Sequence, residues 1–179
     1  MRLSTPLVLL TLALPIPAMA QDATDTTLPL TAEIRGTSET ALQDTLYELV
    51  ALKHKTHQMH WNIVGPDFYQ LHEFYGEIYE GVDAFIDPTA ERLRALGFPA
   101  DARPSAVAEN TSGVLAEAPT EEMEGMQTTE ELLPAFEEFS ARLYDRIDAT
   151  EEDLPTQDFL IGIAYEIDKF TWQIRAHTK

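Results

Sequence analysis

The stretch from residue 60 to residue 73 reads HWNIVGPDFYQLHE. Gly65 and Pro66 stand at its centre, and such a pair interrupts a helix, because proline has no backbone N–H to donate and glycine accepts turn conformations. Proline followed by aspartate is also typical of the first turn of a new helix. The stretch therefore predicts a turn between two helices, with His60 able to approach His72 across it.

Apolar residues recur at steps of three and four in four segments, which is the spacing of an amphipathic helix. We expect helices over residues 37–62, 67–96, 129–149 and 155–177, with Thr37 or Ser38 capping the first. Residues 101–125 are rich in proline, alanine, serine and glutamate and read as a long connection, with room for a short helix near 105–110. No strand pattern competes. The sequence therefore predicts an all-α four-helix bundle with a long crossover connection between the second and third helices.

Residues 1–20 stand apart from the rest of the chain. Arg2 is followed by an apolar run over 7–14 that is too short to cross a bilayer, and Ala18-Met19-Ala20 has the small residues of a cleavage site. A buried N-terminal helix is the alternative, but Pro15 and Pro17 argue against it. We expect a signal peptide over 1–20, a flexible segment over 21–36 and one folded domain over 37–179. Export to the periplasm or the outside follows, with no membrane span after cleavage.

The chain is strongly acidic, with a formal net charge of −19 at pH 7. Removal of residues 1–20 would take away Arg2 and no acidic residue. Such a charge repels phosphate backbones, so nucleic-acid binding is not expected, whereas cations are attracted. Solubility alone would also explain the charge. The chain has no cysteine, so any metal must be held by imidazole and carboxylate groups.

Two pairs of metal-capable side chains emerge from the spacing. His60 and His72 flank the turn, and Asp87 and Glu91 lie four residues apart on one face of the second helix. His72 and Asp87 differ by only about 60° in direction around the helix but lie about 22 Å apart along it. One ion cannot contact both pairs in a single chain. Pro88, beside Asp87, is expected to kink the helix.

An antiparallel two-fold dimer would bring the imidazole pair of one chain against the carboxylate pair of its mate and create two identical sites. Mixed nitrogen and oxygen ligands suit iron or manganese, and also zinc. Each residue also has an ordinary explanation. Asp87 and Glu91 could pair with Arg92 or Arg94, and Trp61 could serve in packing. His54 is expected to be a surface residue, and the role of His57 stays open.

The same residues carry a family resemblance. Residues 60–73, the segment DPTAERLRALG over 87–97 and DKFTW over 168–172 closely resemble the Dps miniferritins (DNA-binding proteins from starved cells) of the ferritin-like superfamily. The similarity extends over residues 37–177. It implies a ferritin-like bundle assembled as a hollow dodecamer of two-fold dimers. It also implies oxidation of Fe²⁺, usually by hydrogen peroxide, and storage of ferric iron. His60 and His72 of one subunit and Asp87 and Glu91 of its mate match the ligands that the family uses.

Two departures from the family pattern stand out. The family usually has an acid four residues after His72, where this chain has Gly76, and Glu77 follows at about 140° around the helix. Glu77 is considered as an additional ligand, while Glu73 and Glu80 do not occupy the expected position. DNA-binding members typically carry a lysine-rich tail, whereas residues 21–31 have no lysine. The second departure, with export, weighs against DNA binding.

The leading hypothesis is a ferroxidase-type oxidoreductase that protects against oxidative damage, with His60, His72, Asp87 and Glu91 binding iron. Asp153 and Asp158, at the start of the fourth helix, are candidates for pore acids. A cage that binds iron, zinc or manganese without oxidising it is the alternative, because Gly76 weakens the centre. A purely structural shell is the third hypothesis.

Overall fold

The computed structural model describes residues 26–111, 113–115 and 117–178. Four long helices dominate it: α1 (Ala32–Asn62), α2 (Phe68–Ala95), α4 (Gly125–Ala149) and α5 (Leu154–His177). Smaller elements are the helix α3 (Pro104–Asn110), the 3₁₀ turn η1 (Gly113–Leu115) and the two-residue strands β1 (Ile63–Val64) and β2 (Met123–Glu124). The predicted signal peptide lies outside the described residues.

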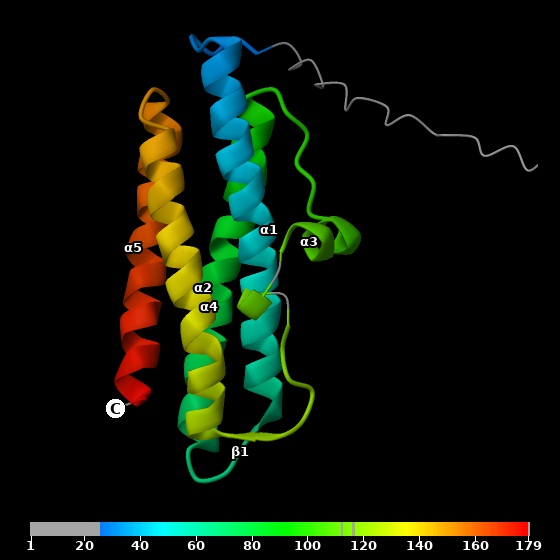
Figure 1. Ribbon diagram of the computed structural model, residues 1–179, viewed down its shortest axis with the longest axis vertical. Helices are drawn as coiled ribbons and strands as arrows, with labels where there is room; N and C mark the ends of the chain where they lie inside the picture. The colour runs from blue at the N-terminus through cyan, green and yellow to red at the C-terminus, as the bar shows by residue number, and fades with distance from the viewer. Residues whose placement is uncertain (1–25, 112, 116, 179) are drawn as a thin grey trace, which may run out of the picture.

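The four long helices form one bundle (Figure 1), in which α1 packs mainly on α2 and α4 mainly on α5. The connection between α2 and α4 runs the length of the bundle and places α3 against α1. This confirms the expected all-α bundle with its crossover between the second and third long helices, and a short helix within the connection. The crossover lets α2 and α4 run in the same direction, which a short loop would not allow.

Leucine, isoleucine and phenylalanine fill the core, as the helical spacing predicts. Leu42, Leu46, Leu49 and Leu52 of α1 are fully buried against Phe136 and Phe139 of α4 and Ile163 and Ile167 of α5. Burial of each such side chain stabilises the fold by about 1.5–3 kcal/mol. The buried Tyr75 hydroxyl donates to Thr128 Oγ1 at 2.7 Å, because the Thr128 hydroxyl itself donates to the Gly125 carbonyl at 2.6 Å.

Helix α1 begins five residues earlier than expected. Its cap is Thr31, whose hydroxyl accepts from the Ile34 N–H at 3.2 Å, and not Thr37 or Ser38. Leu28 and Leu30 pack against the core ahead of it. The last part of the segment predicted to be flexible, residues 32–36, is therefore helical, since a side-chain cap and an apolar anchor precede it.

A short parallel pairing fixes the α1–α2 turn, although no strand was expected. Ile63 pairs with Met123 and Val64 with Glu124, so the turn is tied to the start of α4. Gly65 adopts φ 97°, a left-handed conformation that favours glycine. The pairing holds the ends of α1, α2 and α4 together at one pole of the bundle.

Asp153 is part of a buried network, and it is not a pore acid. It is 1% exposed and caps α5 by accepting from Thr156. Its carboxylate also accepts from Arg92 at 2.8 Å and from the Ser38 hydroxyl at 2.8 Å. The sequence-based assignment was wrong because Arg92 and Ser38, which neutralise and enclose this carboxylate, are distant in sequence. Asp158 lies exposed on α5.

The helix α2 continues through Pro88 as one helix from Phe68 to Ala95. Among the residues that the structure describes, no helix has both the length and the apolar character needed to cross a membrane.

Replacing Asp153 with alanine should lower the free energy of unfolding by about 3 kcal/mol, because the change leaves Arg92 without its buried partner and removes the cap of α5. Asp158→Ala, an exposed change in the same helix, should cost less than about 0.5 kcal/mol. Urea unfolding followed by circular dichroism measures both, and equal losses would contradict the structural role of Asp153.

The same carboxylate predicts a pH dependence. Burial alone would raise the pKa of Asp153, but hydrogen bonds from Thr156 and Ser38 and the charge of Arg92 outweigh it, so the pKa lies below its ordinary value. The contribution of Asp153 to stability is therefore complete above about pH 4 and declines as the pH falls through the lower, folded value. Asp153→Asn should flatten this acid limb in urea unfolding measured from pH 7 downward.

Candidate metal half-sites

His60 and His72 come together across the α1–α2 turn, as the sequence predicts. His60 lies in the last turn of α1 and His72 in the second turn of α2, and both are half-buried. Their rings stack with centroids 3.7 Å apart and planes inclined by 20°. The turn around Gly65 and the β1–β2 pairing position the two helix ends that carry them.

Each of the two histidines bonds to the backbone of the other. Nδ1 of His60 lies 2.7 Å from the His72 carbonyl oxygen, and Nδ1 of His72 lies 2.9 Å from the His60 carbonyl oxygen. A carbonyl oxygen can only accept, so each Nδ1 donates and carries the proton. Each neutral ring therefore has its lone pair on Nε2, which is the arrangement that metal-binding histidines use.

Asp87 and Glu91 form the second pair. Both are exposed on α2, four residues apart and on one face. The arginines that could have neutralised them are engaged elsewhere: Arg92 binds Asp153, and Arg94 donates to the Phe98 carbonyl at 3.0 Å. Within the described part of the chain, neither carboxylate forms an ion pair, so both are available to a cation.

The structure keeps the two pairs apart within one chain. His72 and Asp87 are separated by about 22 Å along α2 at the rise of an α-helix. Among the described residues, no group of three or more histidine or acidic side chains is arranged to hold a metal ion. One chain thus presents two incomplete half-sites, which is the arrangement expected if a second subunit completes each site.

Gly76 leaves space beside the imidazole pair. A Cβ built on Gly76 would lie 3.8 Å from His60 Cε1, which is ordinary van der Waals contact. Helix α2 is unbroken there, so Glu77 remains exposed and about 140° away from His72 around the helix. The structure therefore does not bring Glu77 to the histidines, but it has room for a side chain at position 76.

Aromatic rings surround the imidazole pair. Phe68 lies 5.1 Å from the His72 ring, and Tyr79 meets the His60 ring edge-on at 5.3 Å. His57 lies 3.8 Å from Tyr79 and stacks on Trp61 at 4.5 Å. Trp61 is 63% exposed, so it does not serve the core of this chain. Sequence analysis missed Tyr79, although its seven-residue spacing from His72 places it on the same face of α2.

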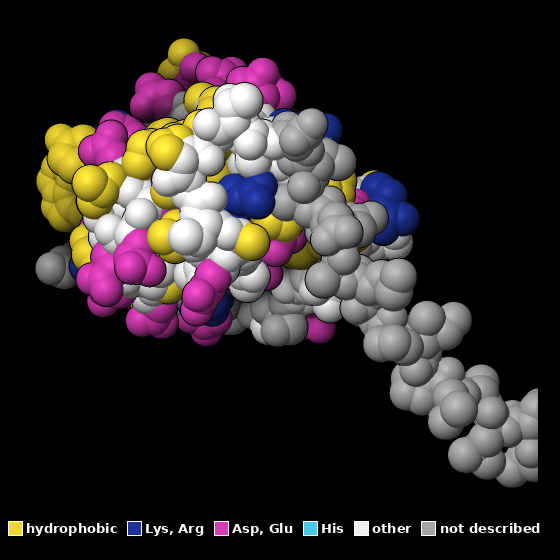
Figure 2. Space-filling view, turned by 90° about the horizontal axis from the view of Figure 1, so that it is seen from above, with side chains coloured by type: hydrophobic (Ala, Val, Ile, Leu, Met, Phe, Trp, Pro, Cys, Tyr) yellow, Lys and Arg dark blue, Asp and Glu magenta, His cyan; other side chains and the backbone are white. Residues whose placement is uncertain are grey.

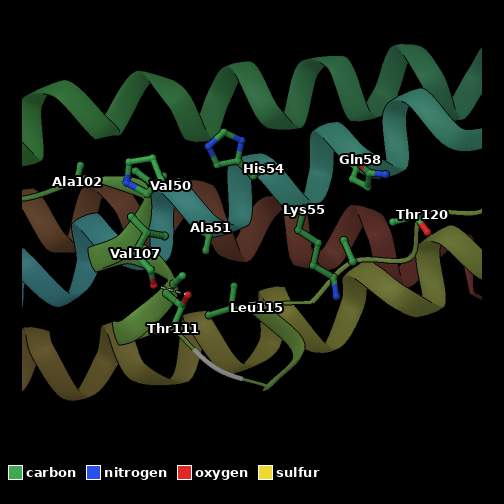
Figure 3. A pocket seen from close by; sticks show the side chains of 13 residues that line it. Val50, Ala51, His54, Lys55, Gln58, Ala102, Val107, Thr111, Leu115 and Thr120 are labelled. Carbon is green, nitrogen blue, oxygen red and sulfur yellow. Dashed lines mark hydrogen bonds between the residues drawn. The ribbon is translucent and has the colours of Figure 1, made fainter.

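His54 and His57 have different surroundings. His54 is exposed and lines a cavity of about 470 Å³ between α1, α3 and residues 111–120. Figure 3 shows Ala51 and Lys55 of α1 opposite Val107 and Thr111 across this cavity, which contains none of the predicted metal ligands. Burial, followed by the neighbouring His60 and Lys53, lowers the pKa of His57. The neutral form of His57 is therefore favoured.

The outer surface carries two further features. Figure 2, which looks down on the bundle, shows acidic side chains in several places around the rim and few lysines or arginines. Hydrophobic side chains gather at the left edge, on the side where α5 lies in Figure 1. Tyr144, Ile161, Tyr165 and Trp172 are exposed large residues of α4 and α5 around one shallow groove.

Comparisons with known proteins agree with the observed fold. The model of the Ferritin-like domain family matches residues 39–179. DNA protection during starvation protein 2 of Deinococcus radiodurans is 35% identical over 153 residues, which cover 84% of this chain and 63% of that protein. The chain thus spans less than two thirds of the length of this relative.

Solved structures show the same similarity. Dps from Mycobacterium smegmatis superposes with a TM-score of 0.81 at 28% identity, covering 86% of this chain and 93% of the other. Dps from Microbacterium arborescens, determined in its high iron form, gives a TM-score of 0.77 at 29% identity over 85% of this chain and 97% of the other.

The hydrogen bonds of the imidazole pair predict one tautomer. In metal-free protein labelled with ¹⁵N-histidine, long-range ¹H–¹⁵N NMR spectra at neutral pH should show His60 and His72 protonated at Nδ1. The exposed His54, whose ring has no backbone carbonyl partner within the described residues, serves as the control and should not show a fixed Nδ1 proton. Protonation of His60 or His72 at Nε2 would contradict the assigned donors.

Proposed function

The chain belongs to the ferritin-like family as a Dps-type member, and from this premise we propose that it binds Fe²⁺ and oxidises it at sites shared between two subunits. The observation that carries the proposal is the pair of half-sites, one where the end of α1 meets the start of α2 and one further along α2. His60 and His72 use Nδ1 for hydrogen bonds to the backbone at one end, and Asp87 and Glu91, which form no ion pair within the described residues, lie at the other. The structure of a relative determined in a high iron form supports iron as the metal.

A two-fold dimer would complete two sites at once. If α2 of one subunit lies antiparallel to α2 of its mate, the histidines of each face the carboxylates of the other. Four such ligands, two nitrogen and two oxygen donors, suit iron better than magnesium or calcium, which prefer oxygen alone. Zinc and manganese fit the same donors and are the expected competitors.

The chain's own residues define the chemistry. The imidazoles hold entering Fe²⁺, and the carboxylates stabilise the more highly charged Fe³⁺ product. At a site that holds two Fe²⁺, each ion gives one electron to hydrogen peroxide, the O–O bond breaks, and two protons complete two water molecules. The net charge of −19 draws cations to the protein. Storage of ferric iron inside a dodecamer, with protection against oxidative damage, completes the proposal.

The exposed apolar groove of α4 and α5 supports assembly beyond a dimer. It lies on the opposite side of the bundle from α1 and α2, so burying it requires further subunits. DNA binding is not part of the proposal, although the Deinococcus relative is named for DNA protection. The net charge and the absence of lysine from residues 21–31 oppose contact with phosphates. Export to the periplasm rests on residues 1–20 alone.

Complementation between two inactive chains tests the shared site. His60→Ala His72→Ala and Asp87→Ala Glu91→Ala should each lose rapid peroxide-dependent oxidation of Fe²⁺, measured by stopped-flow absorbance. When the two variants are refolded together, half of the randomly formed dimers contain one chain of each, and each of these has one complete site out of two. The mixture should therefore recover about one quarter of the parent rate.

The matched control is His54→Ala combined with Glu130→Ala, which removes an exposed histidine and an exposed acid outside the site and should keep the parent rate. Oligomer size is measured for every sample. Activity that survives in either pair of substitutions, or that fails to return in assembled mixed dimers, would contradict a site made from both subunits.

A second candidate function is a cage that binds divalent metal without oxidising it, and Gly76 favours it. A Cβ at position 76 would lie 3.8 Å from His60 Cε1, so the start of a longer side chain fits beside the imidazole pair. Gly76→Asp should therefore tighten binding of the second metal ion by about tenfold or more, because it adds a ligand. Anaerobic Fe²⁺ titration measures this as two ions per site in the variant and one tightly bound ion in the parent.

Gly76→Ala, which adds the Cβ without the carboxylate, is the control and should keep the parent stoichiometry. Two tightly bound ions per site in the parent would show that the glycine does not weaken the centre. Stoichiometric uptake by the parent without consumption of peroxide would establish the non-oxidising cage instead.

A further inference from the structure

Tyr79 lies at the inner edge of the imidazole pair. It follows His72 by seven residues on α2, is half-buried, and meets the His60 ring edge-on with centroids 5.3 Å apart and planes at 80°. The His57 ring lies 3.8 Å from the Tyr79 ring. Among the described tyrosines, Tyr79 has a ring contact with a proposed metal ligand, whereas the buried Tyr75 is hydrogen bonded to Thr128.

The rings form a continuous series from the metal half-site to the surface. His72 stacks on His60, His60 contacts Tyr79, Tyr79 contacts His57, and His57 stacks on Trp61 at 4.5 Å and 16°. Trp61 at the end is 63% exposed. Tyrosine and tryptophan are the side chains that give up one electron most readily, and electron transfer is fast between rings in contact.

Gly76 affects how many electrons the metal site can supply to hydrogen peroxide. Reduction of hydrogen peroxide to water takes two electrons, and two Fe²⁺ ions supply them in the reaction proposed above. If the absence of an acid at position 76 weakens binding of the second ion, some sites hold a single Fe²⁺, and such a site can supply only one electron. Breakage of the O–O bond with a single electron releases hydroxyl radical, which damages the protein.

We propose that Tyr79 supplies the second electron at sites that hold a single Fe²⁺, an inference that rests on the proposed iron oxidation. Fe²⁺ and the Tyr79 phenol each give one electron to one hydrogen peroxide molecule. The O–O bond breaks, and the phenolic proton leaves with one peroxide oxygen as water. The products are Fe³⁺, a neutral tyrosyl radical, water and hydroxide. His57 and Trp61 connect Tyr79 to the surface.

Freeze-quench EPR tests this assignment. Parent protein loaded with one Fe²⁺ per site and mixed with hydrogen peroxide should give an organic-radical signal, with one peroxide consumed per Fe²⁺. Ring-deuterated tyrosine should narrow the signal in the otherwise unchanged parent. Tyr79→Phe keeps the packed ring and should lose the signal, while a spin trap should detect released hydroxyl radical. Gly76→Asp loaded with two Fe²⁺ should weaken the signal, because the second ion supplies the electron.

Tyr165→Phe, an exposed tyrosine of α5, is the matched control and should keep the signal and the rate of Fe²⁺ oxidation. Fe²⁺ oxidation is followed by absorbance in the same samples, which separates the two proposals. Absence of oxidation in the parent overturns the proposed function. Three results would overturn the role of Tyr79. The first is normal Fe²⁺ oxidation without a radical, and the second is a radical signal that is unchanged in Tyr79→Phe. The third is a signal that is lost in Trp61→Phe and retained in Tyr79→Phe.

Discussion

The mutual hydrogen bonding of His60 and His72 is the constraint on which the half-site depends. Each Nδ1 donates to the backbone carbonyl of the other residue, so the two bonds fix both ring orientations and the distance between the ends of α1 and α2. The bonds also leave both Nε2 lone pairs unprotonated. A single feature therefore contributes to the geometry of the turn and to the chemistry of the site. The His60 carbonyl lies in the last turn of α1, where the helix supplies no N–H partner, so rotation of the His72 ring would leave that carbonyl unpaired.

The carboxylate half follows a different principle. Asp87 and Glu91 are exposed and form no ion pair within the described part of the chain, because the neighbouring Arg92 binds Asp153 instead. The buried network at one end of the bundle thus removes the cation that would otherwise compete for these acids. Stability and the proposed metal binding are connected through one arginine, although Asp153 is not itself a proposed ligand. The imidazole half is ordered by hydrogen bonds, whereas the carboxylate half is kept free for a charge from outside the chain.

Much of this could be predicted from the sequence, and the exceptions have physical causes. Periodicity located the long helices and the crossover, and the Gly65-Pro66 turn predicted the approach of His60 to His72. The start of α1 at Ala32 was missed, because its cap follows a threonine-rich segment without periodicity. The β1–β2 pairing involves two residues in each strand, too few for a pattern. The burial of Asp153 and the contact of Tyr79 with His60 depend on packing between helices, which spacing along one helix does not reveal.

The parallel pairing of Ile63 with Met123 joins residues that are far apart in sequence, whereas the two histidines that it positions are only twelve residues apart. Closing a longer loop costs more chain entropy, and contacts over long separations form later in folding. The α1–α2 hairpin can therefore form before the β1–β2 pairing fixes the end of the crossover connection. If the hairpin forms first, the imidazole pair is in place before the rest of the bundle has assembled. Whether metal is present during refolding thus becomes a variable of its own, separate from metal loading of the finished assembly.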